Sequence, residues 1–379
     1  MPSITSQIQA YLPYMKSYIL RDQMKTKNFY LVILFILATA TTIIFLGNPA
    51  PNLHTIVSET HKQISNIKNI PTNIRYSNAE DFNVNPTYLM ILGFNSIDIS
   101  GLSVSKKENE SKPKEKIGFP VIATSVDPAR PLEQVDQLIT SVKKYLPNKN
   151  VVLFDLGLGG SGADSLKQMC NKTGICQVRA FPFEKFPSHV KYLGTHSYRP
   201  ICIQEMLNEY GSVIWADPSE YFISGDMDKS IKQAQTVGIS AWTIDDPTSA
   251  LTHPKMFEFF KTKKEKYYFH HAVKSTHLII YNTDRVHREL MLPWVKCALT
   301  EECIDPTGAQ SSGCTDRRPR YMYSGCHKYD MSSLNVILGI LFDYVSNEYA
   351  SEDKIFGVLS PGSNATSPKY FTKAKLSQV

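Results

Sequence analysis

The chain has 379 residues, 42% of them hydrophobic, which is enough to bury the core of one large domain or two modest ones and excludes a small scaffold held by disulfides. Its net charge of +6 comes from 41 basic and 35 acidic residues that are spread along the sequence. Because Lys and Arg form no dense block, the composition does not indicate a nucleic-acid partner.

The first element in chain order is an uncharged apolar run at residues 29–47, FYLVILFILATATTIIFLG. At about 1.5 Å per residue, a helix of this length spans a hydrocarbon core of roughly 30 Å. The residues before it are mainly basic and include Lys16, Arg21, Lys25 and Lys27, so this flank is expected to stay in the cytosol. The pattern predicts a signal-anchor, and therefore a single-pass type II membrane protein of the Golgi or endoplasmic reticulum. A cleaved signal peptide is the alternative, but its apolar core is usually shorter and nearer the start.

A luminal location for the rest of the chain predicts glycosylation and oxidised cysteines. Three glycosylation sequons follow the apolar run, at Asn109, Asn171 and Asn364. All 7 cysteines follow it as well. The closest pair, Cys170 and Cys176, is expected to form a disulfide.

Four later cysteines are expected to form two further bridges, whose connectivity the sequence leaves open: Cys297, Cys303, Cys314 and Cys326. A zinc site is the alternative for these four, but no CxxC occurs and their spacings match no zinc module. Cys202 lies on the apolar face of a predicted helix and is expected to be a buried free thiol.

The region after the apolar run divides into a stem and a domain. Residues 48–117 are polar and rich in Asn, Ser and Lys, a composition that buries too little apolar surface to fold by itself. Within this stem, residues 87–98 are more apolar, and whether they pack as an accessory strand on the domain stays open. The predicted luminal domain covers residues 118–360, residues 361–379 form a C-terminal tail, and residues 1–28 form the cytosolic tail.

Within the predicted domain, strand-like and helix-like segments alternate. Strands are expected at 120–126, 150–158, 177–183, 212–217, 240–244 and 275–283. Helices are expected at 131–146, 163–170, 200–211, 227–237, 289–299 and 332–346. This alternation predicts an α/β fold, with a mostly parallel central sheet covered by helices on both faces.

The strand at 212–217 ends in an acid that is followed by Pro218 and Ser219. In an open parallel sheet, ligands bind beyond the carboxyl ends of the strands. Asp217 in that position can hold Mg²⁺ or Mn²⁺ against a diphosphate, because hard cations prefer oxygen ligands. The alternative is structural, since Asp-Pro-Ser is a common turn sequence in which the aspartate binds nearby backbone amides.

Several segments together resemble the GT-A nucleotide-sugar glycosyltransferases, which have a Rossmann-like fold, and most closely their glycogenin-like retaining group: PVIATSVD, YRPICIQEML, VIWADPSEYF, STHLIIYNTD and YDMSSLNVIL. SHVKYL and HKYDMSSLNVIL bring the chain closer still to an invertebrate-expanded family of type II membrane proteins of uncharacterised function. The resemblance covers residues 118–345. It implies a nucleotide-sugar donor, a glycan or protein acceptor, and Mn²⁺ or Mg²⁺ as cofactor.

Carried over to this sequence, the resemblance makes Asp217 the first acid of a metal-binding Asp-x-Asp motif, and Ser219 stands where the second acid belongs. Asn282 matches the closing Asn of a later strand motif, whose Asn and Gly positions hold other residues here. Asp330 and Asn335 match the two ends of a late Asp-Gln-x-x-x-Asn motif. The C-terminal segment that supplies a diphosphate ligand in that group is absent.

These positions define the predicted site. The catalytic residues are expected to be Asp217 and Asp330. The donor-binding residues are expected to be Thr124, Ser125, Arg199, Ser219 and Asn282. The metal ligands are expected to be Asp217 and His327.

The chemistry expected of such a site is stabilisation of the leaving diphosphate by a cation or a fixed positive side chain. Arg199 at a helix N-terminus is the better candidate for that charge, and Lys191 is the other. Each residue also has a structural alternative. Arg199 and Lys191 can be ordinary surface residues, Asp330 can cap its helix, and His327 can support the Cys326 bridge.

Two rival functions remain open at this point. The segment FDLGLGGSGAD, residues 154–164, resembles the first motif of S-adenosylmethionine-dependent methyltransferases, in which glycines let the backbone approach the cofactor. The following strand, however, carries no acid at its end to hold a ribose. The third candidate is a non-catalytic interaction domain on a degenerate transferase scaffold, because Ser219 replaces the second acid and fold does not imply activity.

Overall fold

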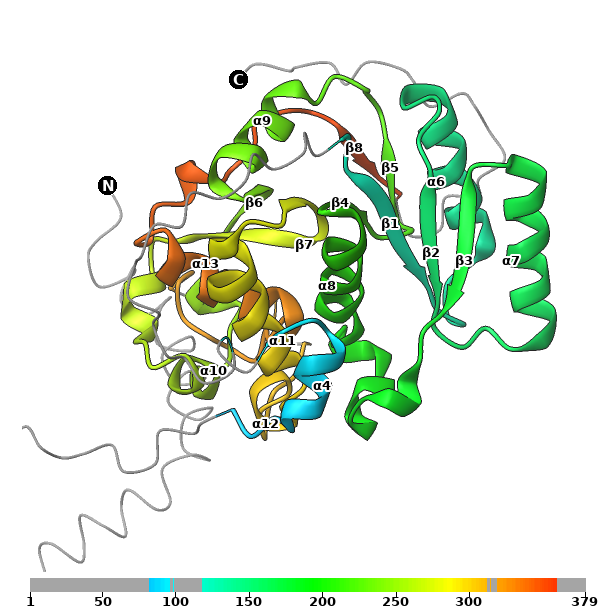
Figure 1. Ribbon diagram of the computed structural model, residues 1–379. Helices are drawn as coiled ribbons and strands as arrows, with labels where there is room; N and C mark the ends of the chain where they lie inside the picture. Colours follow the sequence, from blue (N-terminus) through cyan, green and yellow to red (C-terminus); the bar gives the residue numbers. More distant parts are fainter. Residues whose placement is uncertain (1–81, 96–97, 99–117, 312–313, 315–318, 360–379) are drawn as a thin grey trace, which may run out of the picture. The chain divides into compact units, whose positions relative to one another are not determined.

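The computed structural model describes residues 82–95, 98, 118–311, 314 and 319–359 (Figure 1). They fall within one compact unit, which begins at Asn78. The predicted cytosolic tail, the signal-anchor, most of the stem and the C-terminal tail lie outside these residues. Among the helices of the described ranges, none has both the length and the apolar character of a membrane span.

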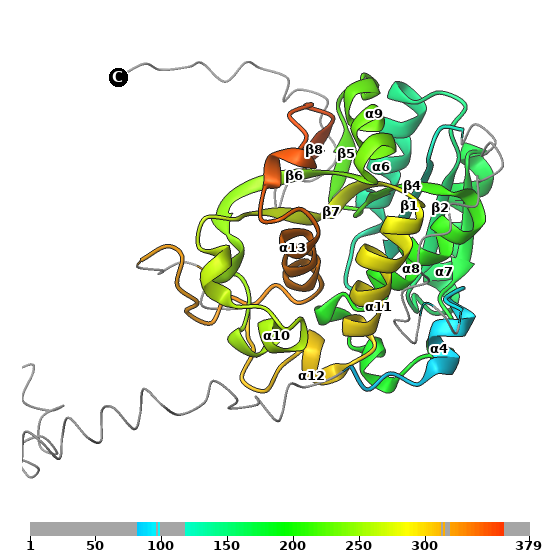
Figure 2. The ribbon, with the colours of Figure 1, turned by 60° about the vertical axis from the view of Figure 1, so that its left-hand side comes forward.

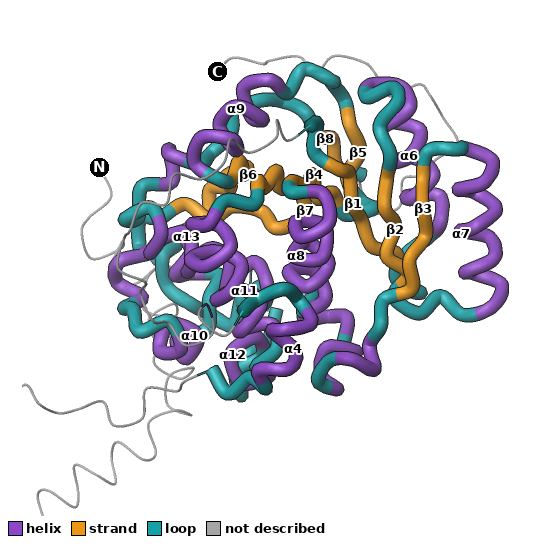
Figure 3. Tube along the Cα trace, in the orientation of Figure 1, coloured by secondary structure: helices purple, strands orange, loops and turns teal. Residues whose placement is uncertain are grey.

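A six-stranded sheet forms the centre of the unit, with the strand order β3-β2-β1-β4-β7-β6 (Figure 3). Its strands are β1 Val121–Val126, β2 Val151–Asp155, β3 Cys176–Ala180, β4 Ser212–Ala216, β6 Ile239–Pro247 and β7 His271–Tyr281. The first four strands run parallel to one another, whereas β7 runs antiparallel to both of its neighbours, β4 and β6. The predicted α/β class with a mostly parallel sheet is therefore confirmed, and β7 is the reversed strand.

Helices cover both faces of this sheet, as Figures 1 and 2 show from two directions. On one face lie α8 Tyr198–Tyr210, α11 Leu292–Ala298 and α13 Asp330–Leu341, and on the other lie α6 Leu132–Tyr145, α7 Gly160–Thr173 and α9 Asp228–Val237. Successive strand residues alternate between the two cores, as they must in a pleated strand. In β4, Val213 and Trp215 join the first core, whereas Ile214 and Ala216 join the second. Two shorter α-helices of the same unit are α10 Pro254–Phe259 and α12 Glu301–Ile304.

The predicted helix at 200–211 shows how local sequence sets these bounds. The helix α8 starts two residues earlier than expected and ends at Tyr210, with Gly211 in the left-handed conformation at φ 73°. Glycine adopts that conformation without steric cost, so it closes the helix and turns the chain into β4. The predicted stop signal is therefore confirmed.

The apolar segment that interrupts the predicted stem packs on this unit as a helix, α4 Pro86–Ile91, and not as a strand. Leu89, Leu92 and Phe94 are buried in the same core as α8. The side-chain amides of Gln204 and Asn208 both donate to the Leu92 carbonyl oxygen. Part of the stem thus belongs structurally to the domain.

A second sheet, which the sequence did not reveal, pairs β5 Glu220–Phe222 with β8 Phe356–Val358 in antiparallel register. The Phe356 ring stacks on the imidazole of His277 in β7 of the central sheet, with ring centroids 4.6 Å apart. The segment that follows β4 is therefore fixed by its pairing with β8.

The cysteine predictions are confirmed. Disulfides join Cys170 with Cys176, Cys297 with Cys303, and Cys314 with Cys326. Cys202 is a free thiol buried in α8. The structure thereby supplies the connectivity of the last four cysteines, which spacing alone left open.

Candidate functional site

Two neighbouring parallel strands are each followed by an acid at the carboxyl end. Asp127 follows β1 and Asp217 follows β4, and the two strands are hydrogen-bonded to each other. The Asp217 amide donates to the Thr276 carbonyl oxygen on β7 at 2.7 Å, which fixes the start of the turn. Because open α/β sheets bind ligands beyond the carboxyl ends of their strands, this edge is the candidate site.

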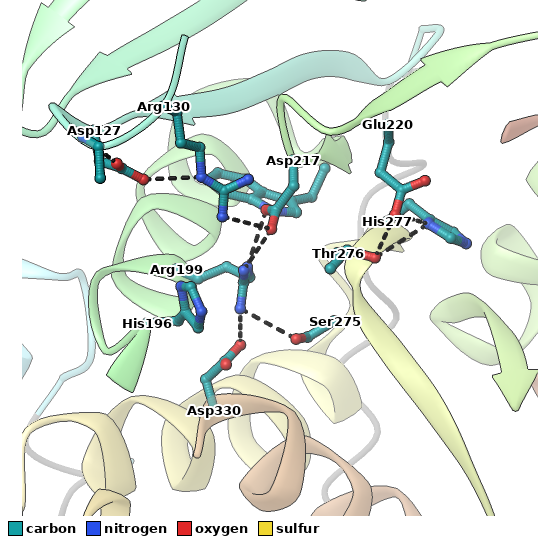
Figure 4. Close-up of polar contacts among 12 residues, drawn as sticks. Asp127, Arg130, His196, Arg199, Asp217, Glu220, Ser275, Thr276, His277 and Asp330 are labelled. Carbon is teal, nitrogen blue, oxygen red and sulfur yellow. Dashed lines mark hydrogen bonds and ion pairs between the residues drawn. The ribbon is translucent and has the colours of Figure 1, made fainter. Parts of the chain in front are cut away.

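Arg199, in the first turn of α8, contacts several polar side chains at this edge of the sheet (Figure 4). Its guanidinium donates to both oxygens of Asp217, from Nε to Oδ1 at 3.3 Å and from Nη2 to Oδ2 at 2.7 Å. The Nη1 atom donates to Asp330 Oδ2 and, at 3.1 Å, to the hydroxyl of Ser275. Two acids more than 100 residues apart in the sequence thus share one guanidinium.

The members of this network are almost completely buried. Arg199 and Asp330 are each 1% exposed, and Asp217 is 2% exposed. Burying charges is costly unless they are paired and hydrogen-bonded, and removing one partner leaves the other charge uncompensated. The indole Nε1 of Trp215 adds a further bond by donating to Asp217 Oδ1 at 2.8 Å. The network is therefore a fixed arrangement of charges.

A second arginine lies at the solvent side of the network, in the loop between β1 and α6. Arg130 Nε donates to Asp127 Oδ2 at 2.9 Å, and its Nη2 lies 4.0 Å from Asp217 Oδ2. The side chain of Arg130 is 23% exposed, against 1% for Arg199. Among the charged groups of the network, Arg130 is thus the one that solvent reaches best. We call Asp127, Arg130, Arg199, Asp217 and Asp330 the charged cluster.

The surroundings shift the pKa values of the cluster in opposite directions. Burial raises the pKa of Asp217, but Arg199 and Arg130 outweigh it and hold that pKa below its usual value. Burial lowers the pKa of Arg199, and Asp217 and Asp330 outweigh it and raise that pKa above its usual value. The Asp217 carboxylate and the Arg199 guanidinium are therefore both charged near neutral pH.

A histidine that the sequence analysis did not single out adjoins the cluster. His196 Nδ1 lies 3.0 Å from the hydroxyl of Tyr198, which also bonds the hydroxyl of Ser125 at the end of β1. Burial and the Arg199 charge lower the pKa of His196, so its imidazole is neutral near pH 7. His196 has a left-handed backbone at φ 54°, and Tyr329, directly before Asp330, has φ 48°. Strained residues of this kind occur often at functional sites.

The expected divalent cation fits these residues poorly. Arg199 and Trp215 already occupy most of the acceptor capacity of Asp217, and Asp330 binds the same guanidinium. Ser219, which stands at the place of the second acid, is only partly exposed, and its carbonyl oxygen accepts from the Leu359 amide. Across the described ranges, no group of three or more His, Cys, Asp and Glu side chains could hold a metal ion.

Some of the predicted donor-binding residues lie at this edge of the sheet, whereas Asn282 lies away from it. Ser125 and Arg199 join the network. The Thr124 hydroxyl is buried, and no hydrogen-bond partner is found for it among the described residues. Asn282 lies at the opposite edge, because β7 is antiparallel and ends beside the start of β4. Its side-chain amide donates to the Leu207 carbonyl oxygen, so its position does not support a role in donor binding.

His327 and Lys191 do not join the cluster either. Both ring nitrogens of His327 are engaged by backbone groups, Nδ1 by the His253 amide at 3.1 Å and Nε2 by the Ile304 carbonyl oxygen at 3.1 Å. A histidine with both nitrogens occupied in this way cannot ligate a metal without breaking one of these bonds. Lys191 is exposed on the surface.

Asp330 is the first residue of α13 and lies in its first turn, directly after the N-cap position, which Tyr329 holds. Its carboxylate pairs with Arg199. The glycine-rich segment after β2 forms a turn and a helix start. The carboxylate of Asp155 accepts from the amides of Gly157 and Leu158, at 2.9 and 2.8 Å. That carboxylate therefore stabilises its own turn.

Asp127, Arg130 and His196 are the site residues that the sequence analysis missed. An acid directly after a predicted strand, with an arginine three residues later, was a signal for the first two. For His196 no comparable signal exists, because its place depends on the left-handed turn before α8.

Residues 93–204 match a family described as "Protein of unknown function (DUF1647)". No curated protein matches this chain. Among solved structures, the apo form of the bifunctional glycosyltransferase WbbM is 10% identical with a TM-score of 0.37, and the match covers 60% of this chain and 38% of that one. The chain thus spans well under half of WbbM.

Two further solved structures show similar values. Mouse xyloside xylosyltransferase 1, in its apo form, is 8% identical with a TM-score of 0.35, and the match covers 61% of this chain and 84% of that one. Core-mannan synthase A from Aspergillus fumigatus, in an Mn/GDP form, is 9% identical with a TM-score of 0.36, covering 60% and 71%. Identities and TM-scores this low assign no activity to this chain.

Proposed function

We propose that this protein is a glycosyltransferase-like enzyme that transfers a sugar from a nucleoside diphosphate donor to a glycan or protein acceptor. One observation carries the proposal. Asp217 and Asp330, the two acids that the family resemblance assigns to catalysis, converge on Arg199 at the carboxyl edge of the parallel strands. An edge of this kind is where open α/β sheets bind their ligands.

Within this proposal four residues of the cluster have roles. Arg130 is the more exposed of the two arginines in the cluster. It interacts with the diphosphate and stabilises the charge that develops on it as the sugar leaves. Asp217 and Asp330 are too buried to contact the donor directly. Their role is to fix Arg199 and, through Asp217, to hold the Arg130 guanidinium in position. Because the network is rigid before the donor arrives, little reorganisation is needed when the donor binds.

We also propose that the domain lies in the secretory lumen. Six of the 7 cysteines pair in disulfides, which persist in oxidising compartments and are rare in the cytosol. The sequon asparagine Asn171 is exposed on the surface, where a glycan can be attached. The signal-anchor at 29–47 remains a prediction from the sequence.

The test is hydrolysis of UDP-sugars and GDP-sugars by the purified full-length chain, compared with Asp217→Asn. Asparagine keeps the size and part of the hydrogen bonding of Asp217 but removes its charge. We expect hydrolysis to fall by about 100-fold or more, since single charged or donor groups at such sites have effects of this size. Arg179→Gln, which breaks an exposed ion pair with Glu209, is the control and should leave the rate unchanged. Equal rates for the wild type and Asp217→Asn would rule out the proposed role.

One observation favours a second candidate, a non-catalytic interaction domain. The acids of the cluster are buried, and two surface pockets of about 250 and 270 Å³ lie elsewhere, one beside Asp98 and His287 and the other beside Phe186 and Glu205. A purified chain that folds but binds neither UDP nor GDP under any condition would support this candidate.

A further inference from the structure

The site that would hold the divalent cation of the proposed reaction is already occupied by an arginine. Arg199 uses Nε, Nη1 and Nη2 to bind Asp217, Asp330 and Ser275. Its side chain is 1% exposed, so water does not compete for these bonds. The guanidinium therefore holds one unit of positive charge between the two acids that the resemblance assigns to catalysis.

A metal ion bound to Asp217 would have to share this space. The free acceptor position of that carboxylate is mainly on Oδ2, which already accepts from Arg199 and has the guanidinium of Arg130 4.0 Å away. A divalent cation at bonding distance from Oδ2 would lie close to both guanidinium groups. Like charges at such distances repel strongly where water is excluded.

The second carboxylate that normally strengthens such a site is absent as well. The position is held by Ser219, and a hydroxyl is a weaker ligand for Mn²⁺ or Mg²⁺ than a carboxylate. His327, the other predicted ligand, has both ring nitrogens engaged by backbone groups. The donor set near Asp217 is therefore weaker than the pair of carboxylates in an Asp-x-Asp motif.

We propose that Arg199 takes the place of the metal ion, so that the donor site binds a nucleoside diphosphate without a divalent cation. The inference rests on the proposed function, because it concerns the same site. Arg199 fixes the acids, and Arg130 at the open side interacts with the phosphate oxygens. Arginine suits that task, since its planar group matches two phosphate oxygens at once.

The first test is calorimetric titration of UDP and GDP into the full-length chain, once with EDTA and once with Mn²⁺. We expect dissociation constants that agree within about threefold between the two conditions. Binding that appears with Mn²⁺ and disappears with EDTA would overturn the inference and leave the proposed function standing. Binding in neither condition would contradict the proposed function and, with it, the inference that rests on it.

The second test needs no nucleotide and measures thermal unfolding with Mn²⁺ or EDTA. Wild-type protein should unfold at the same temperature in both. Stabilisation of the wild type by Mn²⁺ that is lost in Asp217→Asn would overturn the inference. This comparison needs no variant of Arg199, so it holds even if such a variant fails to fold.

Removing the guanidinium should create the metal dependence that the wild type lacks. Arg199→Met keeps much of the volume and leaves Asp217 and Asp330 without their common partner. We expect Mn²⁺ to raise the unfolding temperature of this variant, because the ion can then bridge the two carboxylates. Arg179→Met makes the same substitution at an exposed ion pair with Glu209, and its unfolding should not respond to Mn²⁺. A folded Arg199→Met variant whose unfolding temperature does not change with Mn²⁺ would contradict the account.

Discussion

Asp127 competes with any phosphate for Arg130, the cation through which we propose that the diphosphate binds. The cluster contains three carboxylates, Asp127, Asp217 and Asp330, and two guanidinium groups, so its formal charge is −1 before any ligand arrives. An anionic ligand at the open side must overcome this negative charge. The carboxylate of Asp127 is the part of it that lies next to Arg130.

We therefore expect Asp127→Asn to bind UDP and GDP more tightly than the wild type, by about threefold to tenfold. Asparagine keeps the side-chain oxygen that accepts from the Ala129 amide, so the loop before α6 should stay intact. Titration calorimetry measures the change. Weaker binding by Asp127→Asn would mean that this carboxylate contacts the ligand directly.

His327 predicts a pH dependence of stability that is independent of the proposed function. Burial lowers its pKa to about 4, whereas an exposed histidine titrates near its ordinary value of about 6.5. Between these values the unfolded chain binds a proton that the folded chain does not. The free energy of unfolding must therefore fall as the pH falls through this range.

We expect the wild type to lose about 2 kcal/mol more stability between pH 7 and pH 5 than His327→Gln does. Glutamine can replace both backbone bonds of His327, accepting from the His253 amide and donating to Ile304, but cannot bind the proton. Urea unfolding at the two pH values checks this. The same loss in both proteins would assign the pH dependence to other groups, such as the buried His270.

Sequence reasoning found Asp217, Arg199 and Asp330 but not their relation to one another. Asp217 and Asp330 were expected to be catalytic and Arg199 to bind the donor, on the basis of three separate segments of the sequence. Nothing in a linear sequence shows that one guanidinium binds two acids that lie far apart along the chain. That fact depends on the packing of α8 against β4 and α13.

The reversed strand β7 explains why Asn282 lies away from the charged cluster. Its apolar pattern, STHLIIYNT, is the same whether the strand runs parallel or antiparallel to β4, so the sequence fixes its burial but not its direction. With β7 reversed, Ser275 lies at the site and Asn282 at the far edge of the sheet. The predicted strands and helices were otherwise found in the expected order, because their periodicity is strong.

The close packing of α13 predicts that stability is sensitive to a larger side chain at Gly339. A Cβ atom on Gly339 would lie 2.3 Å from the ring of Tyr267, whose hydroxyl donates to the Val336 carbonyl oxygen in the same helix. We expect Gly339→Ala to lower the free energy of unfolding by about 1–3 kcal/mol, despite the better helix propensity of alanine. Gly160→Ala in α7, where a Cβ meets no atom, is the control and should be neutral or slightly stabilising. Denaturant unfolding of both variants compares them, and equal stability would show that the ring moves freely.

The proposed luminal location of the protein can be tested at its sequons. Asn171 lies exposed in the last turn of α7, and N-linked glycans are added to such sequons in the secretory lumen. We expect protein expressed in animal cells to lose apparent mass on treatment with an endoglycosidase, and Asn171→Gln to carry one glycan fewer. Protein without any glycan would contradict the luminal orientation and, with it, the predicted signal-anchor.

The central claim is that the charged cluster binds the diphosphate of a nucleotide donor. A crystal structure of the protein soaked with UDP or GDP in the presence of EDTA tests it most directly. The account predicts diphosphate density within hydrogen-bond distance of the Arg130 guanidinium, with Arg199 still bound to Asp217 and Asp330. Nucleotide density at another surface, with the cluster unchanged, would contradict it.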